Sequence, residues 1–144
     1  MSVNIRPCRP EERDALADLW HHAEASPSPT DTPELIGRVI GDSAATVLVA
    51  VDGDRLVGSI IGGWDGWRGN LYRLAVLPSY RRRGIARALV AEAERRLTER
   101  GAVRISALVE YDHPWAVGFW DSLYEHDQRM IRYIKPVEST RRLS

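Results

Sequence analysis

The sequence predicts an α/β (mixed α+β) protein in which a central mixed β-sheet is flanked by helices. Strand-length apolar runs, several of them rich in Val and Ile, alternate with stretches whose apolar residues recur at helical spacing. The longest helical stretch, residues 83–100, lies between two such runs. Because a strand–helix–strand connection places its strands parallel, this arrangement predicts a mixed sheet. We expect one domain at residues 1–135 and a C-terminal tail at 136–144.

The N-terminal half contains a strand and two helices. A strand is predicted at residues 2–6, and prolines end it. Apolar residues at helical spacing then predict a helix over residues 11–23, which opens with two glutamates. A loop rich in Ser and Pro at residues 26–33 leads to a second short helix at about 35–40.

The middle of the chain predicts three antiparallel strands. Residues 46–51 and 55–63 are apolar runs joined by the turn Asp52-Gly53-Asp54, which is typical of a hairpin. A second turn at residues 64–70 leads to a strand at 71–77, which Pro78 ends. By strand alternation, Tyr72 should face the same side as Leu74 and Val76.

The C-terminal part adds two helices and two strands. The helix at 83–100 ends at a glycine and is followed by a strand at 103–109. A short helix at about 115–123 and a last strand at 130–134 complete the predicted order.

Composition excludes several classes of protein. Of the 144 residues, 20 are Lys or Arg and 20 are Asp or Glu, so no overall basic charge favours nucleic acid as a partner. No apolar stretch reaches the ~20 residues that cross a bilayer, and no signal peptide is visible. The single cysteine, Cys8, cannot form an internal disulfide. We expect a cytoplasmic protein with no nucleic-acid or membrane partner.

The turn between the strand at 71–77 and the long helix predicts an anion site. The first amides of a helix have no partner inside it, and they lie at the positive end of its dipole. Gly84 leaves these amides accessible, while Ala86 allows close packing on the sheet. Charge at the same point comes from Arg81, Arg82, Arg83 and Arg87. These features predict a bound diphosphate.

The alternative is a solvated charge run at a helix start. That alternative leaves Gly84 unexplained, because a glycine within a helix costs about 1 kcal/mol relative to alanine. Neither the G-x-G-x-x-G fingerprint nor the P-loop pattern is present, which argues against a nicotinamide or ATP site.

Arg81-x-x-Gly84-x-Ala86, after Leu-Ala-Val-x-Pro, resembles the acetyl-CoA signature of the GNAT N-acetyltransferase superfamily. The predicted order of elements is similar to that of the family from about residue 3 to about residue 135. The resemblance implies direct transfer of the acetyl group of acetyl-CoA to a primary amine of a small molecule or protein. It also implies that a homodimer is one option for the assembly.

The resemblance further implies how the coenzyme is held. Amides of residues 82–87 would bind the diphosphate, and the backbone of Leu74 and Val76 would bond the pantetheine arm. A bulge in this strand would free an amide to act as an oxyanion donor. His113 stands where many members have an asparagine near the pantetheine. The predicted coenzyme-binding residues are Leu74, Ala75, Val76, Arg81, Arg82, Arg83, Gly84, Ile85, Ala86, Arg87 and His113.

The chain departs from the family where a tyrosine often serves as the general acid, because Trp120 occupies that position. The predicted catalytic candidates are therefore Tyr124 as an acid, Tyr72 and Glu110 as bases, and His113 as either; Asp65 is a further base candidate. The missing tyrosine leaves an alternative open, a catalytically weak acyl-CoA-binding sensor or scaffold.

The acceptor side should be built from the end of the first helix, the loop at 26–33 and the loop after Glu110. Adjacent His21 and His22 suggest a metal, but neighbouring residues on a helix point about 100° apart. We expect no metal site.

Overall fold

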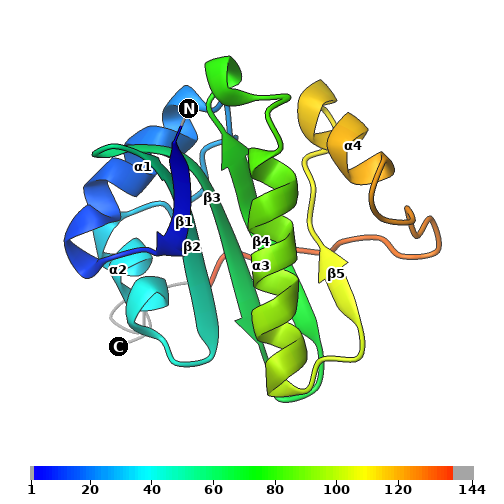
Figure 1. Cartoon of the computed structure of the whole chain (residues 1–144). Helices are drawn as coiled ribbons and strands as arrows, with labels where there is room; N and C mark the ends of the chain where they lie inside the picture. The colour runs from blue at the N-terminus through cyan, green and yellow to red at the C-terminus, as the bar shows by residue number, and fades with distance from the viewer. Residues whose placement is uncertain (1, 138–144) are drawn as a thin grey trace, which may run out of the picture.

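The computed structural model describes residues 2–137, which form a five-stranded mixed sheet with helices on both faces (Figure 1). The elements in chain order are β1 (Val3–Pro7), α1 (Arg13–His22), α2 (Pro33–Gly41), β2 (Ala45–Asp52), β3 (Arg55–Trp64), β4 (Gly69–Val76), α3 (Ile85–Arg100), β5 (Ile105–Ala107) and α4 (Pro114–Asp121). Short 3₁₀ turns lie at Pro10–Glu12 and Pro78–Tyr80. The predicted fold class is confirmed.

The strands follow one another in the order β1-β2-β3-β4-β5. The first four pair antiparallel, whereas β4 and β5 pair parallel across α3, as the crossover predicts. Gly58 and Gly62 of β3 lie against Leu89 and Leu97 of α3. Ser59 points to the other face, where it contacts α1. The two faces are thus covered by different helices.

A bulge interrupts β4. Ser59 pairs with Ala75 and Ile61 pairs with Tyr72, so two residues of β4, Arg73 and Leu74, lie opposite one residue of β3. Arg73 has φ of 52°, in the left-handed region. The bulge that the family resemblance implied is therefore present.

The bulge overturns the side-chain alternation predicted for β4. Val76 pairs with Gly58, which faces α3, whereas Tyr72 pairs with Ile61 on the opposite face. Tyr72 and Val76 consequently point to different sides, because the extra residue shifts the alternation by one.

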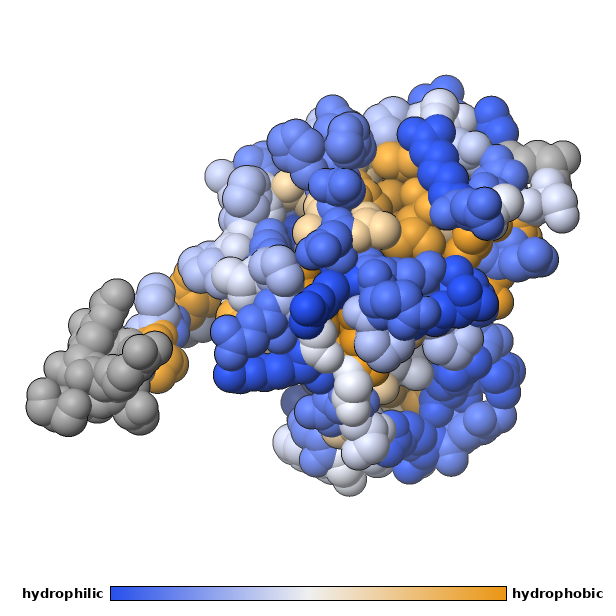
Figure 2. All heavy atoms as spheres, turned by 90° about the vertical axis from the view of Figure 1, so that its left-hand side faces the viewer, coloured by the Kyte–Doolittle hydropathy of each residue, from blue (hydrophilic) through white to orange (hydrophobic). Residues whose placement is uncertain are grey.

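The predicted strand at 130–134 is wrong. Residues 130–137 form neither helix nor strand, and Met130, Ile131 and Ile134 are 70%, 74% and 72% exposed. A strand needs a paired neighbour, and β5 has only three residues rather than the predicted 103–109. Figure 2 shows this end of the chain leaving the body of the molecule. Most of the predicted tail, residues 138–144, lies outside the described residues.

Cys8 follows β1 in the core, and its N–H donates to the Val47 carbonyl at 2.8 Å. Burial raises the pKa of its thiol to about 11. Among residues 2–137 the structure contains no helix long and apolar enough to span a membrane.

Candidate active site

The turn before α3 exposes main-chain amides. Arg82 and Gly84 have φ of 63° and 84°, and α3 begins at Ile85. The first bond into the helix runs from the Ala88 N–H to the Gly84 carbonyl at 3.1 Å. Gly84 is therefore the N-cap in a left-handed conformation, rather than part of the first helical turn as the sequence suggested. A glycine adopts this conformation without strain.

A pocket of about 360 Å³ lies in front of these amides, between the start of α3 and α4. Its lining from the predicted coenzyme-binding set is Val76, Arg81, Arg82, Gly84, Ile85, Ala86 and Arg87. On the α4 side the wall contains Trp115 and Phe119, whose rings stack at 5.9 Å. A Cβ placed on Gly84 would meet no atom within 4 Å, so it would project into open space. We call this the α3 pocket.

Two of the predicted arginines have partners within the chain. Arg81 donates to the Val76 carbonyl at 3.0 Å and to the Ala23 carbonyl at 3.1 Å, and it pairs with Glu24 at 3.2 Å. Its guanidinium also lies 4.6 Å from the Trp115 ring centre. Arg83 lies 5.2 Å over the Tyr80 ring. The Arg81 side chain thus joins β4 to the end of α1, and its contact with the coenzyme stays a prediction.

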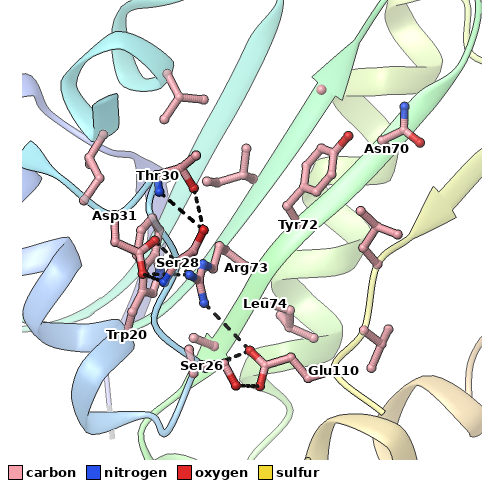
Figure 3. Close-up of a pocket in the computed structure, with 18 of the residues that line it drawn as sticks. Trp20, Ser26, Ser28, Thr30, Asp31, Asn70, Tyr72, Arg73, Leu74 and Glu110 are labelled. Atoms are coloured by element: carbon pink, nitrogen blue, oxygen red, sulfur yellow. Dashed lines mark hydrogen bonds and ion pairs between the residues drawn. The ribbon is translucent and has the colours of Figure 1, made fainter. Parts of the chain in front are cut away.

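A larger cleft of about 1010 Å³ opens on the face of the sheet that carries α1 and α2. It is walled by the loop after α1, by β4 and by the loop between β5 and α4 (Figure 3). Arg132 and Ile134 of the C-terminal segment also contribute to its wall. Trp115 lines both this cleft and the α3 pocket, and Ala75 of the cleft is next to Val76 of the pocket. We call it the acceptor cleft.

Arg73 is the centre of a charged network in the acceptor cleft. Its Nη2 lies 2.8 Å from both carboxylate oxygens of Asp31, and its Nη1 lies 3.8 Å from Glu110 (Figure 3). The guanidinium also lies 4.9 Å from the Trp20 ring centre. The bulged residue of β4 is therefore held by the loop after α1 and by the loop after β5.

Glu110 joins these two loops. Its Oε1 accepts from the Ser26 N–H and its Oε2 from the Ser26 hydroxyl, both at 2.9 Å. Tyr72 lies on the same side of the sheet, and Figure 3 shows its ring directed into the cleft. Both candidates line the same cleft, but their catalytic roles stay predictions.

His113 is the N-cap of α4 and lines the acceptor cleft. Its Nδ1 accepts from the Ala116 N–H at 3.3 Å, and its Nε2 lies 3.4 Å from the Ala23 carbonyl. Because Nδ1 accepts, the neutral ring carries its proton on Nε2. The ring also lies 6.0 Å from that of Trp115, the residue that lines both pockets. The predicted coenzyme contact and acid or base role of His113 stay predictions.

Tyr124 is separated from the other candidates. Its hydroxyl donates to Glu94 of α3 at 2.6 Å, and it belongs to the lining of neither pocket. Burial first, and then the hydrogen bond to Glu94, raise the pKa of this phenol. Trp120 is buried and packs on Tyr124 at 4.8 Å. The position of Tyr124 gives no support to its predicted role as an acid.

The sequence reading missed Arg73 and Asp31. Arg73 is the one charged residue in the run 71–77, which was the available signal. Asp31 lies within the loop predicted for the acceptor side, but nothing local indicates a partner 42 positions away. Among the described residues no cluster of three potential metal ligands occurs.

A profile described as the acetyltransferase (GNAT) family matches residues 11–123. The chain belongs to the GNAT acetyltransferase family. This family member is an acyltransferase. It is 35% identical over 122 residues to an acetyltransferase of Pectobacterium atrosepticum, covering 84% of this chain and 86% of that protein.

Solved structures share the fold of this family member. One is an aminoglycoside N-acetyltransferase, AAC(6')-Iy, in complex with CoA, at a TM-score of 0.75 and 19% identity, covering 94% of this chain and 96% of the other. Another is a ribosomal-protein-alanine N-acetyltransferase from Brucella melitensis, at a TM-score of 0.72 and 18% identity, covering 94% and 100%. Family membership and the CoA complex of that neighbour are consistent with acetyl-CoA as the cosubstrate.

Proposed function

We propose that this GNAT protein transfers the acetyl group of acetyl-CoA to a primary amine of a small molecule or protein. The observation that carries the proposal is the junction of the two pockets. The α3 pocket has main-chain amides suited to phosphate, and the acceptor cleft has charged side chains suited to an amine. They adjoin at Ala75 and Val76, beside the bulge.

The residues of the α3 pocket fit a coenzyme diphosphate. The amides of Ile85, Ala86 and Arg87 precede the first hydrogen-bonded amide of α3, and Gly84 leaves the space before them open. In the described residues these amides have no main-chain partner. Arg82 and Arg87 add positive charge at the same opening.

Acetyl-CoA would supply the acetyl group as an activated thioester. In the transfer, the acceptor nitrogen bonds to the carbonyl carbon, the C–S bond breaks, the thiolate takes up a proton and the amine gives one up. A free alkyl amine is largely protonated at neutral pH, so the cleft must accept that proton. Glu110 is a candidate for accepting this proton because it has a carboxylate in the cleft, and Tyr72 because its ring points into the cleft. A chain of water molecules could carry the proton to either residue.

The test is release of free CoA thiol on mixing the protein, acetyl-CoA and a panel of amines. The panel contains polyamines, aminoglycosides and peptides with free N-termini or lysines. We expect amine-dependent thiol release with at least one class, and the acetylated amine in the mass spectrum. Thiol release that does not depend on any amine would contradict the proposal.

A second candidate, an acyl-CoA sensor, is favoured by one observation. Trp120, at the position where the family resemblance implies a tyrosine, is buried, and the Tyr124 hydroxyl is engaged by Glu94. Calorimetric binding of acetyl-CoA without turnover of any amine would select the sensor. A homodimer remains a prediction that sedimentation of the purified protein would test.

A further inference from the structure

We propose that Ser59 is a positioning residue that orients the peptide unit between Arg73 and Leu74, so that the Leu74 N–H faces the gap between β4 and β5. This inference rests on the proposed acetyl transfer for its catalytic consequence. Its structural part is independent of any activity.

Ser59 is fully buried and is the one buried polar side chain among the residues described. Its hydroxyl donates to the Arg73 carbonyl at 2.9 Å and accepts from the Trp20 indole N–H at 3.0 Å. Because Trp20 can only donate, the hydroxyl proton is directed to Arg73. A chain of two hydrogen bonds, the first buried and the second partly buried, therefore runs from α1 through β3 to the bulge.

The hydrogen bond fixes the direction of the next amide. The Arg73 carbonyl and the Leu74 N–H belong to one planar trans peptide unit, in which the two groups point in opposite directions. Since Ser59 draws the carbonyl toward β3, the Leu74 N–H points away from β3 and toward β5.

The gap on that side is open. The Gly69 N–H donates to the Arg104 carbonyl and the Leu108 N–H to the Leu71 carbonyl, each at 3.1 Å. The pairing of β4 with β5 ends at Leu71 and Ala107, two residues before the bulge. Leu74 and Leu108 then line the acceptor cleft from the two separated strands. The Leu74 N–H is thus presented to the cleft, where a thioester oxygen would require a donor.

Side chains around the bulge hold Arg73 in its unfavourable backbone conformation. A non-glycine residue in the left-handed region is energetically unfavourable, because its Cβ comes too close to the following carbonyl oxygen. Its ion pair with Asp31 and its contact with Trp20 offset this cost. Trp20 takes part twice, through its ring under Arg73 and through its N–H on Ser59.

The first test measures amide exchange at Leu74 by NMR in the wild type and in Ser59→Ala, both without ligand. In the wild type we expect fast exchange because the N–H faces an open gap. In Ser59→Ala the peptide is free to turn its N–H toward β3, so we expect the exchange to slow by about tenfold or more. Equal exchange in both proteins would overturn the proposal, whether or not the chain is an enzyme.

The second test measures kinetics with an amine that the wild type acetylates. Removing an oxyanion donor lowers kcat by about 10²–10³-fold, so misdirecting one in Ser59→Ala should lower kcat by about 10–100-fold. Binding of CoA, measured by calorimetry, should stay within about threefold, because the α3 pocket is untouched. An unchanged kcat alongside altered Leu74 exchange would overturn the catalytic part.

Two further variants control for stability. Trp20→Phe keeps a ring but removes the N–H that orients the Ser59 hydroxyl. We expect a smaller fall in kcat, of about 2–10-fold. This variant replaces Ser59→Ala in the kinetic test if Ser59→Ala does not fold. Val90→Ala removes buried volume from α3 on the opposite face of the sheet. It should lower Tm without changing kcat. If Val90→Ala lowered kcat as much as Ser59→Ala, a general loss of packing would explain both.

Discussion

The α3 pocket and the acceptor cleft are built from different parts of the chain. The first is lined largely by one continuous turn and helix start, residues 81–87, with α4 as its far wall. The second depends on side chains from three distant segments, joined by Arg73 to Asp31 and Glu110. A site made by local backbone is insensitive to most side-chain changes, whereas a site made by paired side chains can be altered one residue at a time.

The largest effect should follow from filling the α3 pocket. Gly84→Glu places a carboxylate before the helix amides and forces a side chain into a left-handed conformation. We expect the Kd for CoA, measured by calorimetry, to rise by at least about 100-fold, with no turnover. Gly84→Asn is the control, because asparagine tolerates that conformation and carries no charge. A Kd for CoA in Gly84→Glu equal to that of the wild type would show that this turn is not the anion site.

A change in the acceptor cleft should leave the coenzyme unaffected. Asp31→Asn removes the charge that pairs with Arg73 and loosens the loop after α1. We expect the KM for the amine to rise by about tenfold while the Kd for CoA stays within about twofold. Glu34→Gln is the matched control, since Glu34 forms an exposed ion pair with Arg38. A parallel loss of CoA affinity would mean that the two pockets are not separable.

Arg81 lies between the pockets, and its substitution should affect both moderately. Arg81→Lys keeps the charge but loses the planar fork that bonds the Val76 and Ala23 carbonyls. We expect rises of about threefold to tenfold in the KM for amine and for acetyl-CoA, together with a lower Tm. Steady-state kinetics with each substrate varied in turn would show this. An effect on acetyl-CoA alone would place the Arg81 side chain at the coenzyme rather than between the pockets.

Tyr124 should matter least for turnover. Tyr124→Phe removes the hydrogen bond to Glu94 outside both pockets, so kcat should change by less than about twofold and stability by about 1 kcal/mol. A tenfold loss of kcat in Tyr124→Phe would instead support Tyr124 as the general acid.

The raised pKa of Tyr124 also has a pH signature. The folded phenol holds its proton more tightly than the unfolded one, whose pKa is near 10.0. Its contribution to stability is therefore fully present below pH 10 and is lost as the pH rises further. Thermal unfolding of the wild type from pH 9 to 11 should show a steeper alkaline loss than that of Tyr124→Phe.

The sequence predicted best what is local. The apolar spacing located α3 and the hairpin of β2 and β3, and the Gly84 motif located the start of α3, because each is specified by neighbours in the chain. The strand predicted at 130–134 failed since its formation depends on a distant partner edge. The position of Gly84 as a cap was also missed, because cap and first turn differ by one residue in the sequence.

The acceptor cleft was harder to predict. The loop at 26–33 and Glu110 do line one cleft, and their role on the acceptor side stays a prediction. The Arg73–Asp31 pair was not predicted, because it joins residues far apart in the chain. The predicted side-chain alternation in β4 was wrong for a related reason. A bulge is defined by how two strands pair, so the residues of one strand alone do not predict it.

The buried Cys8 has a practical consequence for enzymology. With its pKa near 11 and 8% of its surface exposed, the sulfur is protonated and covered at neutral pH. Only a thiolate attacks disulfide dyes readily. A colorimetric assay with such a dye should therefore count coenzyme product with little background from the protein itself, even at high protein concentration.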